Sequence, residues 1–158
     1  SWPQRTTRDA SGARAFRSAR LGTMEDAATA IWNRACSRAG SPPEAPIGDR
    51  MLTLAITLDG MIQADGIPQQ WETWEGPPEG VEALRWFGLS EAADLVAAGE
   101  ELAGTADIDA AERFELEIEP RYYELDTTHA LDEAFQLRLA THPEDFLPPG
   151  WAGGQAPW

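Results

Sequence analysis

The sequence contains no lysine, one cysteine and only two histidines. The single cysteine, Cys36, excludes an internal disulfide and fits a reducing compartment. Two distant histidines, His129 and His142, exclude the zinc motifs that place histidines three or four residues apart. No apolar run approaches the roughly 20 residues that span a bilayer, and no secretory signal is recognisable. These absences predict a cytoplasmic protein that binds no metal or cofactor and is not an enzyme.

Acidic residues dominate the charge of the chain. The 158 residues contain 27 Asp and Glu against 12 Arg, which gives a formal net charge of -15. Such a field repels nucleic acid and anionic membranes, and it speeds the association with basic proteins. The hydrophobic content of 42% is nevertheless that of a globular protein, and the length fits one domain. The expected partner is therefore a basic protein, without direct contact to nucleic acid or membrane.

The two ends differ in composition from the body. Residues 1–23 hold five arginines but one acid, and we interpret them as a flexible basic leader. Two alternatives are a start at Met24 with a non-native extension before it, and a leader that folds back on the acidic body. Residues 24–147 form the predicted acidic helical domain, and residues 148–158 form a tail of Pro, Gly and Trp.

Apolar residues recur at helical spacing through this body, between segments rich in Pro and Gly. The pattern predicts helices over about 25–39, 47–63, 68–74, 79–87 and 128–140, and one from an N-cap at Ser90 to Gly104. We expect the helix over 47–63 to be central, because apolar residues cover most of its sides. Cys36 falls on the inner stripe of the first helix and is expected to be buried. The predicted fold is a single compact all-α domain with loosely packed termini.

The segment 107–119 carries two conflicting signals. Asp109 and Glu112 resemble a capping box, which indicates a helix. Phe114, Leu116 and Ile118 alternate with glutamates, which is typical of an edge strand. We favour the helix, because no other segment offers a strand partner.

Carboxylates are densest between Glu100 and Asp126, where only two arginines oppose them. On a helix, three of these acids, Glu112, Glu115 and Glu119, would share one face at about 5–6 Å spacing. Such a row approaches the spacing of phosphates along a nucleic-acid strand. The alternative interpretation is a solvated surface that only maintains solubility. The predicted protein-binding residues are Glu100, Glu101, Asp107, Asp109, Glu112, Glu115, Glu117, Glu119, Glu124 and Asp126.

Two stretches resemble the DNA-mimic protein (DMP) family, over about residues 51–146. The first is LAITLDGMIQADGIPQQW (54–71) followed by GVEALRWFGLSEAADL (80–95), and the second joins RYYELD (121–126), LDEAF (131–135) and HPEDF (142–146). The resemblance marks Gly66, Gln69 and Trp71 as a structural motif, in which Gly66 permits a left-handed turn and Gln69 bonds helix ends. Asp65, Ile67 and Gln70 depart from the Gly, the Phe and the aromatic residue of the family pattern.

The resemblance implies an all-helical domain, often dimeric, whose acidic surface occupies the DNA-binding face of a helix-turn-helix regulator. This function predicts affinity that falls steeply with salt, and a loss of binding without unfolding when Glu112, Glu115 and Glu119 become Lys. One alternative is an immunity-like inhibitor that blocks the cationic active site of a nuclease toxin. A third is a carboxylate-based hydrolase with a cleft lined by Trp71 and Trp74 together with Trp86.

Overall fold

In the computed structural model, the described residues are 26–37 and 43–148, so the predicted leader and residues 149–158 of the predicted tail lie outside them. Every regular element of the described part is helical, and these elements pack into one compact domain. The predicted all-α fold is thus confirmed, including the helix chosen for 107–119. A first helix covers residues 26–36. The others are α2 (Ile47–Asp65), α3 (Ile67–Thr73), α4 (Pro77–Trp86), α5 (Ser90–Ala98), the 3₁₀ turn η1 (Glu100–Leu102), α6 (Ile108–Arg113), the π-helical turn η2 (Phe114–Ile118), α7 (Glu119–Glu124), α8 (Thr127–Thr141) and the 3₁₀ turn η3 (Pro143–Asp145).

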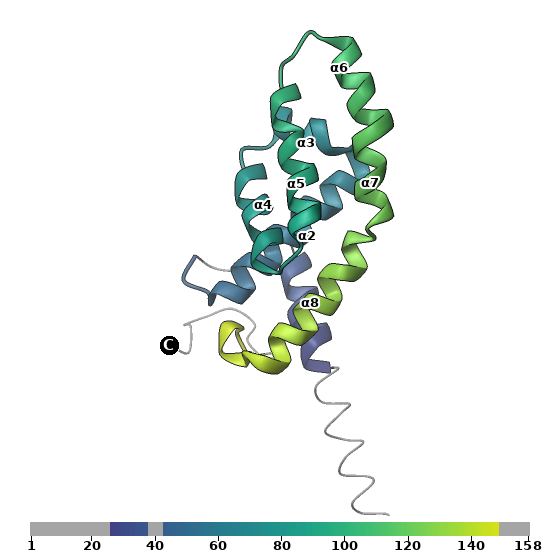
Figure 1. The fold of residues 1–158 in the computed structure, drawn as a ribbon. Helices are drawn as coiled ribbons and strands as arrows, with labels where there is room; N and C mark the ends of the chain where they lie inside the picture. Colours follow the sequence, from purple (N-terminus) through teal and green to yellow (C-terminus); the bar gives the residue numbers. More distant parts are fainter. Residues whose placement is uncertain (1–25, 38–42, 149–158) are drawn as a thin grey trace, which may run out of the picture.

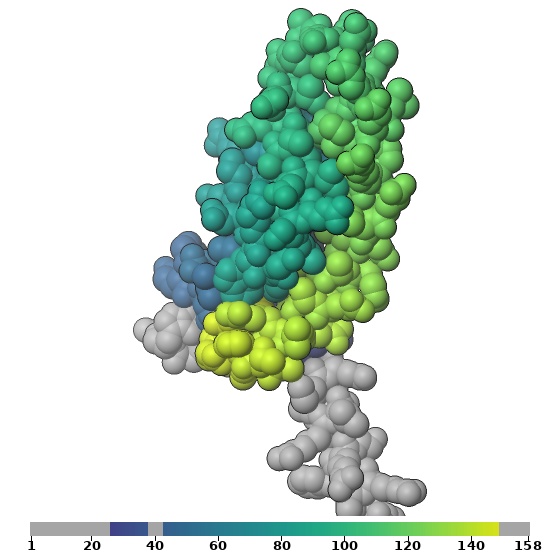
Figure 2. Space-filling model, in the orientation of Figure 1, coloured from purple at the N-terminus to yellow at the C-terminus, as the bar shows by residue number. Residues whose placement is uncertain are grey.

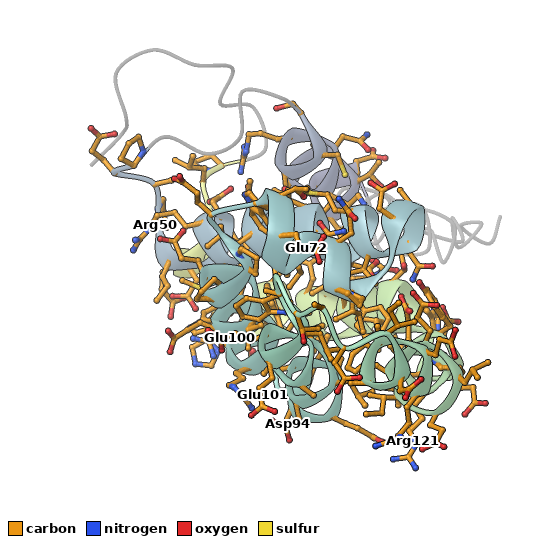
Figure 3. All side chains as sticks on the ribbon, turned by 90° about the horizontal axis from the view of Figure 1, so that it is seen from above. Arg50, Glu72, Asp94, Glu100, Glu101 and Arg121 are labelled. Carbon is orange, nitrogen blue, oxygen red and sulfur yellow. The ribbon has the colours of Figure 1, made fainter. Side chains whose placement is uncertain are left out.

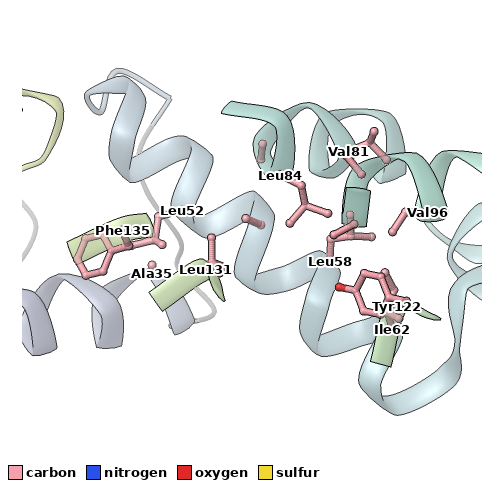
Figure 4. Packing of buried hydrophobic residues seen from close by; sticks show 14 of the residues in the cluster. Ala35, Leu52, Leu58, Ile62, Val81, Leu84, Val96, Tyr122, Leu131 and Phe135 are labelled. Carbon is pink, nitrogen blue, oxygen red and sulfur yellow. The ribbon is translucent and has the colours of Figure 1, made fainter. Parts of the chain in front are cut away.

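Helix α2 is the centre of the domain, as its apolar pattern predicted. It contacts α3, α4, α8 and η3, and its residues Leu52, Ala55, Leu58 and Ile62 are fully buried. Burial of each large side chain contributes roughly 1.5–3 kcal/mol. Figure 4 shows two groups of core residues along α2. Leu52 belongs to the group with Ala35, Leu131 and Phe135, and Leu58 to the group with Ile62, Val81, Leu84, Val96 and Tyr122.

A buried carboxylate fastens the end of the described chain to α2. Asp49, in the first turn of α2, accepts hydrogen bonds from the guanidinium of Arg34 at 2.6 Å and from the backbone N–H of Leu147. Arg34 also donates to the carbonyl of Pro148 at 2.9 Å. Because Asp49 is 1% exposed and meets two donors, its charge is compensated inside the protein. The pair joins the first helix, α2 and the segment after η3.

A second buried carboxylate sets the position of α7 and α8. Asp59, in the middle of α2, accepts hydrogen bonds from Tyr122 Oη at 2.7 Å and from the hydroxyl of Thr128. Burial and the negative charge of Asp59 raise the pKa of Tyr122 far above its usual value, so the phenol remains a donor. Asp126, between α7 and α8, has φ 47° and turns the chain in the left-handed region.

Three expectations are corrected. Cys36 is exposed rather than buried, because Ile31 and Ala35 take the inner face of its helix and the next residue points outward. Partial burial still raises the pKa of its thiol. Helix α5 begins at Ser90 but ends at Ala98, before η1, so Gly104 does not close it. Ser90 is the first helical residue, with Leu89 in the N-cap position.

Candidate functional site

The predicted contact acids are on η1 and on a helical column, which we define as residues 108–124 and which consists of α6, η2 and α7 without interruption. Figure 1 shows the column as one long side of the molecule, from α6 at the top down to α8. In Figure 2 its outer surface forms an edge of the visible face, and no other segment lies across it. Glu100 and Glu101 are on η1, and Asp107 and Asp126 flank the column.

Asp107, not Asp109, caps the column. The carboxylate of Asp107 accepts the backbone N–H of Ala110 at 3.1 Å, which satisfies one of the free donors in the first helical turn. The backbone N–H of Asp107 is in turn bonded to the hydroxyl of Thr105 at 3.2 Å. Asp109 lies in the first turn of α6, where its negative charge favours the helix N-terminus. The N-cap therefore lies two residues before the predicted one, and the predicted capping box of Asp109 and Glu112 is not formed, because Ala110 at the third position has no side chain that could bond back.

The column passes Pro120 without breaking, because η2 is a π-helical turn. Proline has no N–H to donate to the carbonyl four residues earlier, and its ring crowds that carbonyl in a regular α-helix. The chain accommodates this by bonding the N–H of Glu119 to the carbonyl of Phe114, five residues back. The wider turn shifts the angular positions of all later side chains. The prediction that Glu112, Glu115 and Glu119 share one face is wrong for this reason.

Glu119 points into the protein and is not part of an outward row. Glu119 is 9% exposed, and its carboxylate accepts the backbone N–H of Ile67 at 2.9 Å and the hydroxyl of Tyr123 at 3.1 Å. Ile67 is the first residue of α3, so Glu119 caps that helix from 52 residues away in the sequence. Burial and the charge of Glu119 raise the pKa of Tyr123 to about 12. The role of Glu119 is structural, and we remove it from the contact set.

The motif at the α2–α3 junction supports this cap. Gly66 has φ 84°, a conformation that residues with a side chain rarely adopt. An added Cβ would also lie 2.5 Å from Glu119 Oε1, so both the backbone conformation and the available space require glycine here. Gln70, rather than the predicted Gln69, bonds the helix ends, because its buried amide donates to the carbonyls of Met61 and Gly66. Gln69 is exposed. Trp71 donates from Nε1 to the carbonyl of Val96 at 2.8 Å, which ties α3 to α5.

Apart from Glu119, all the predicted contact acids are exposed. In the described part of the chain, no arginine forms a salt bridge with any of them. Arg34, Arg85 and Arg138 pair instead with acids outside this set. The two arginines of the column, Arg113 and Arg121, are exposed and have no ion-pair partner among the described residues. Apart from Glu119, the carboxylates of the column therefore have no cationic partner among the described residues.

Negative charge is not confined to the column. Figure 3 shows charged side chains projecting on all sides of the domain, and its labels place Glu72 on a different side from Arg121. The column is thus one part of a broadly acidic surface rather than a single ridge. Exposed acids outside the predicted set include Asp26, Asp65, Glu72, Glu79, Glu82, Glu91, Asp94 and Glu133.

The three tryptophans of the hydrolase alternative make separate structural contacts. Trp71 bonds to α5, as described above. Trp74 lies against Gly76, where an added Cβ would meet its ring at 2.6 Å. Trp86 meets Phe87 edge-on and carries the guanidinium of Arg138 over its ring at 4.5 Å. These contacts account for the three side chains through packing and hydrogen bonding.

The surface also contains clefts of moderate volume. One of about 420 Å³ lies between α2 and α4, with Met51 and Leu54 among its lining residues and Arg50, Glu79 and Glu82 as its charged groups. Within the described residues, no group of three or more His, Cys, Asp or Glu side chains has an arrangement that could bind a metal ion. None of the described helices combines the length and hydrophobicity that a membrane crossing requires. In comparisons with protein-family models, curated proteins and solved structures, no significant match to this chain was found.

Proposed function

We propose that this protein is an acidic binding module that occupies the cationic surface of a basic protein, and that it does so as a mimic of DNA. The observation that carries the proposal is the state of the column carboxylates other than Glu119, which are exposed and form no salt bridge with any arginine of the described residues. Like charges held close together on a helix repel one another. A partner that brings lysines and arginines relieves this repulsion, so the charge of the column favours a cationic surface.

The packing of the column suits this role, because a mimic of a stiff polyanion needs carboxylates on a rigid support. Phe114 and Tyr122 anchor the column in the core, and Glu119 and Tyr123 bond it to α2 and α3. Preorganised charges lose less conformational freedom on binding than charges on a disordered tail. A DNA-binding surface, such as that of a helix-turn-helix regulator, offers the complementary field.

The proposal is tested with a partner captured from the source cells at low salt and then purified. We expect the Kd to rise by about tenfold or more between roughly 50 and 200 mM salt, as it does for proteins that bind phosphates. We also expect the partner's DNA and this protein to exclude each other in a competition assay. Affinity that does not change with salt, or simultaneous binding of DNA, would contradict DNA mimicry.

Two matched triple variants localise the contact. Reversal of three exposed column residues, Glu112→Lys with Glu115→Lys and Glu117→Lys, is expected to weaken binding by at least about tenfold. The control changes the net charge equally on α3, the following loop and α4, through Glu72→Lys, Glu75→Lys and Glu82→Lys, and should cost about threefold at most. Equal losses in the two variants would mean that net charge alone, and not the column, directs binding.

A further inference from the structure

Two large apolar side chains are strongly exposed on the column. Ile108 is 71% exposed and Leu116 is 77% exposed, and both lie outside the hydrophobic core cluster. They are eight residues apart, with Glu112 midway between them, and steps of four residues place the three side chains on neighbouring turns of one side of the helix, over roughly 12 Å. Isolated exposed apolar residues are common on protein surfaces. Here, however, two of them lie on the same outward side of a helix.

Carboxylates surround this apolar pair. Asp109, Glu112 and Glu117 are exposed on the same turns of α6 and η2. A second copy of the chain would bring an equally acidic surface, and the net charge of -15 opposes that contact. The same field opposes anionic lipid and nucleic acid. Only a cationic surface satisfies the carboxylates while it covers the apolar side chains.

We infer that the side of the column with Ile108, Glu112 and Leu116 is a docking face for a basic amphipathic helix of the partner. The apolar side chains of that helix would pack on Ile108 and Leu116, and its arginines or lysines would pair with the flanking carboxylates. The inference rests on the proposed function and adds to it a second source of affinity. Contacts between charges weaken as salt rises, whereas the burial of Ile108 and Leu116 does not. A docking face of this kind also favours basic helices with an apolar side over uniformly basic segments.

The probes are two synthetic helical peptides with the same number of arginines. One carries leucines on one side of the helix and the other carries serines at those positions. We expect the full chain to bind the arginine–leucine peptide about tenfold more tightly, and to keep that ratio at high salt. The double variant Ile108→Ser with Leu116→Ser should lose the preference and retain its salt dependence.

Leu137 provides the matched control, because it is 67% exposed but lies on α8. Leu137→Ser should keep the full preference for the leucine peptide. Equal affinity for the two peptides, a preference that survives the double variant, or a preference lost in Leu137→Ser overturns the docking face. Equal affinities that fall steeply with salt overturn the docking face alone and leave the acidic binding function standing. Affinities for both peptides that do not change with salt overturn both.

Discussion

Removal of the Glu119 carboxylate tests whether this acid is a structural cap or a surface charge. In Glu119→Ala the backbone N–H of Ile67, a residue that is 0% exposed, loses its acceptor. A buried donor without a partner costs about 1–3 kcal/mol, and bonds to charged groups lie at the upper end of that range. Tyr123 retains the carbonyl of Ile62 as a partner at 3.2 Å. We therefore expect a loss of about 2–3 kcal/mol in the free energy of unfolding.

The assay is equilibrium unfolding in urea, followed by circular dichroism. With a slope of about 2 kcal/mol per molar urea, the expected loss lowers the midpoint by roughly 1 M. Glu119→Gln keeps an oxygen that can accept from Ile67 and should fall between the alanine variant and the wild type. Glu115→Ala is the matched control, because it lies on the same column but is exposed, and it should stay within about 0.5 kcal/mol of the wild type.

The ranking of the variants decides the interpretation. If Glu119→Ala and Glu115→Ala unfold at the same urea concentration, the carboxylate of Glu119 does not cap α3 and the separation of this acid from the contact set is wrong. If only Glu119→Ala is destabilised, variants that test binding by charge reversal on the column must keep Glu119 unchanged. For the same reason, Glu119→Lys is expected to unfold the protein rather than to report on binding.

Three further outcomes follow from named contacts. Gly48→Ala should lower the free energy of unfolding by about 1–3 kcal/mol, because the new Cβ would lie 2.7 Å from the Phe146 ring. Gly60→Ala on the same helix meets nothing within 4 Å and should raise the free energy of unfolding by roughly 0.5–1 kcal/mol. Thermal unfolding of the two variants checks both values. The pKa of Tyr123 is raised from 10.0 to about 12, chiefly by burial and then by its acidic neighbour, so its contribution to stability is present below pH 10 and is lost as the pH rises toward 12. Urea midpoints measured across this range should fall, and they should fall less in Tyr123→Phe. The exposed Cys36 should react fully with a thiol reagent in the native state. Its reaction at neutral pH should be slower than that of a free thiol, because its pKa is raised and less thiolate is present. Protection of Cys36 until the protein unfolds would contradict its exposure.

Much of the fold could be predicted because helical periodicity is a local signal. The apolar stripe of α2 lies within the helix itself, and Pro and Gly mark the ends of the neighbouring elements, so the observed bounds of α2, α3, α4 and α8 differ from the prediction by two residues or fewer. The end of α5 was missed, because the chain enters η1 at Glu100, only two residues after the last α-helical residue, Ala98. Cys36 was missed because one helical step separates it from the buried Ala35.

The buried polar residues could not be identified from local pattern. Asp49, Asp59 and Glu119 look like any other acids in an acidic chain, yet their partners Leu147, Tyr122 and Ile67 lie far away in the sequence. A carboxylate is stable inside a protein only where such donors converge, and convergence depends on how helices pack. The buried Gln70 illustrates the same point, because the sequence offers two adjacent glutamines and only the packing selects between them.

The sequence by itself determined the helical class, the central position of α2 and the strong negative charge, since these depend on composition and on short-range spacing. Only the tertiary structure decided which carboxylates face outward. Pro120 is visible in the sequence, but the π turn that accommodates it, and the inward rotation of Glu119 that follows, depend on the contacts of the column with α2 and α3. Charge is a property of the residue, whereas its availability to a partner is a property of the fold.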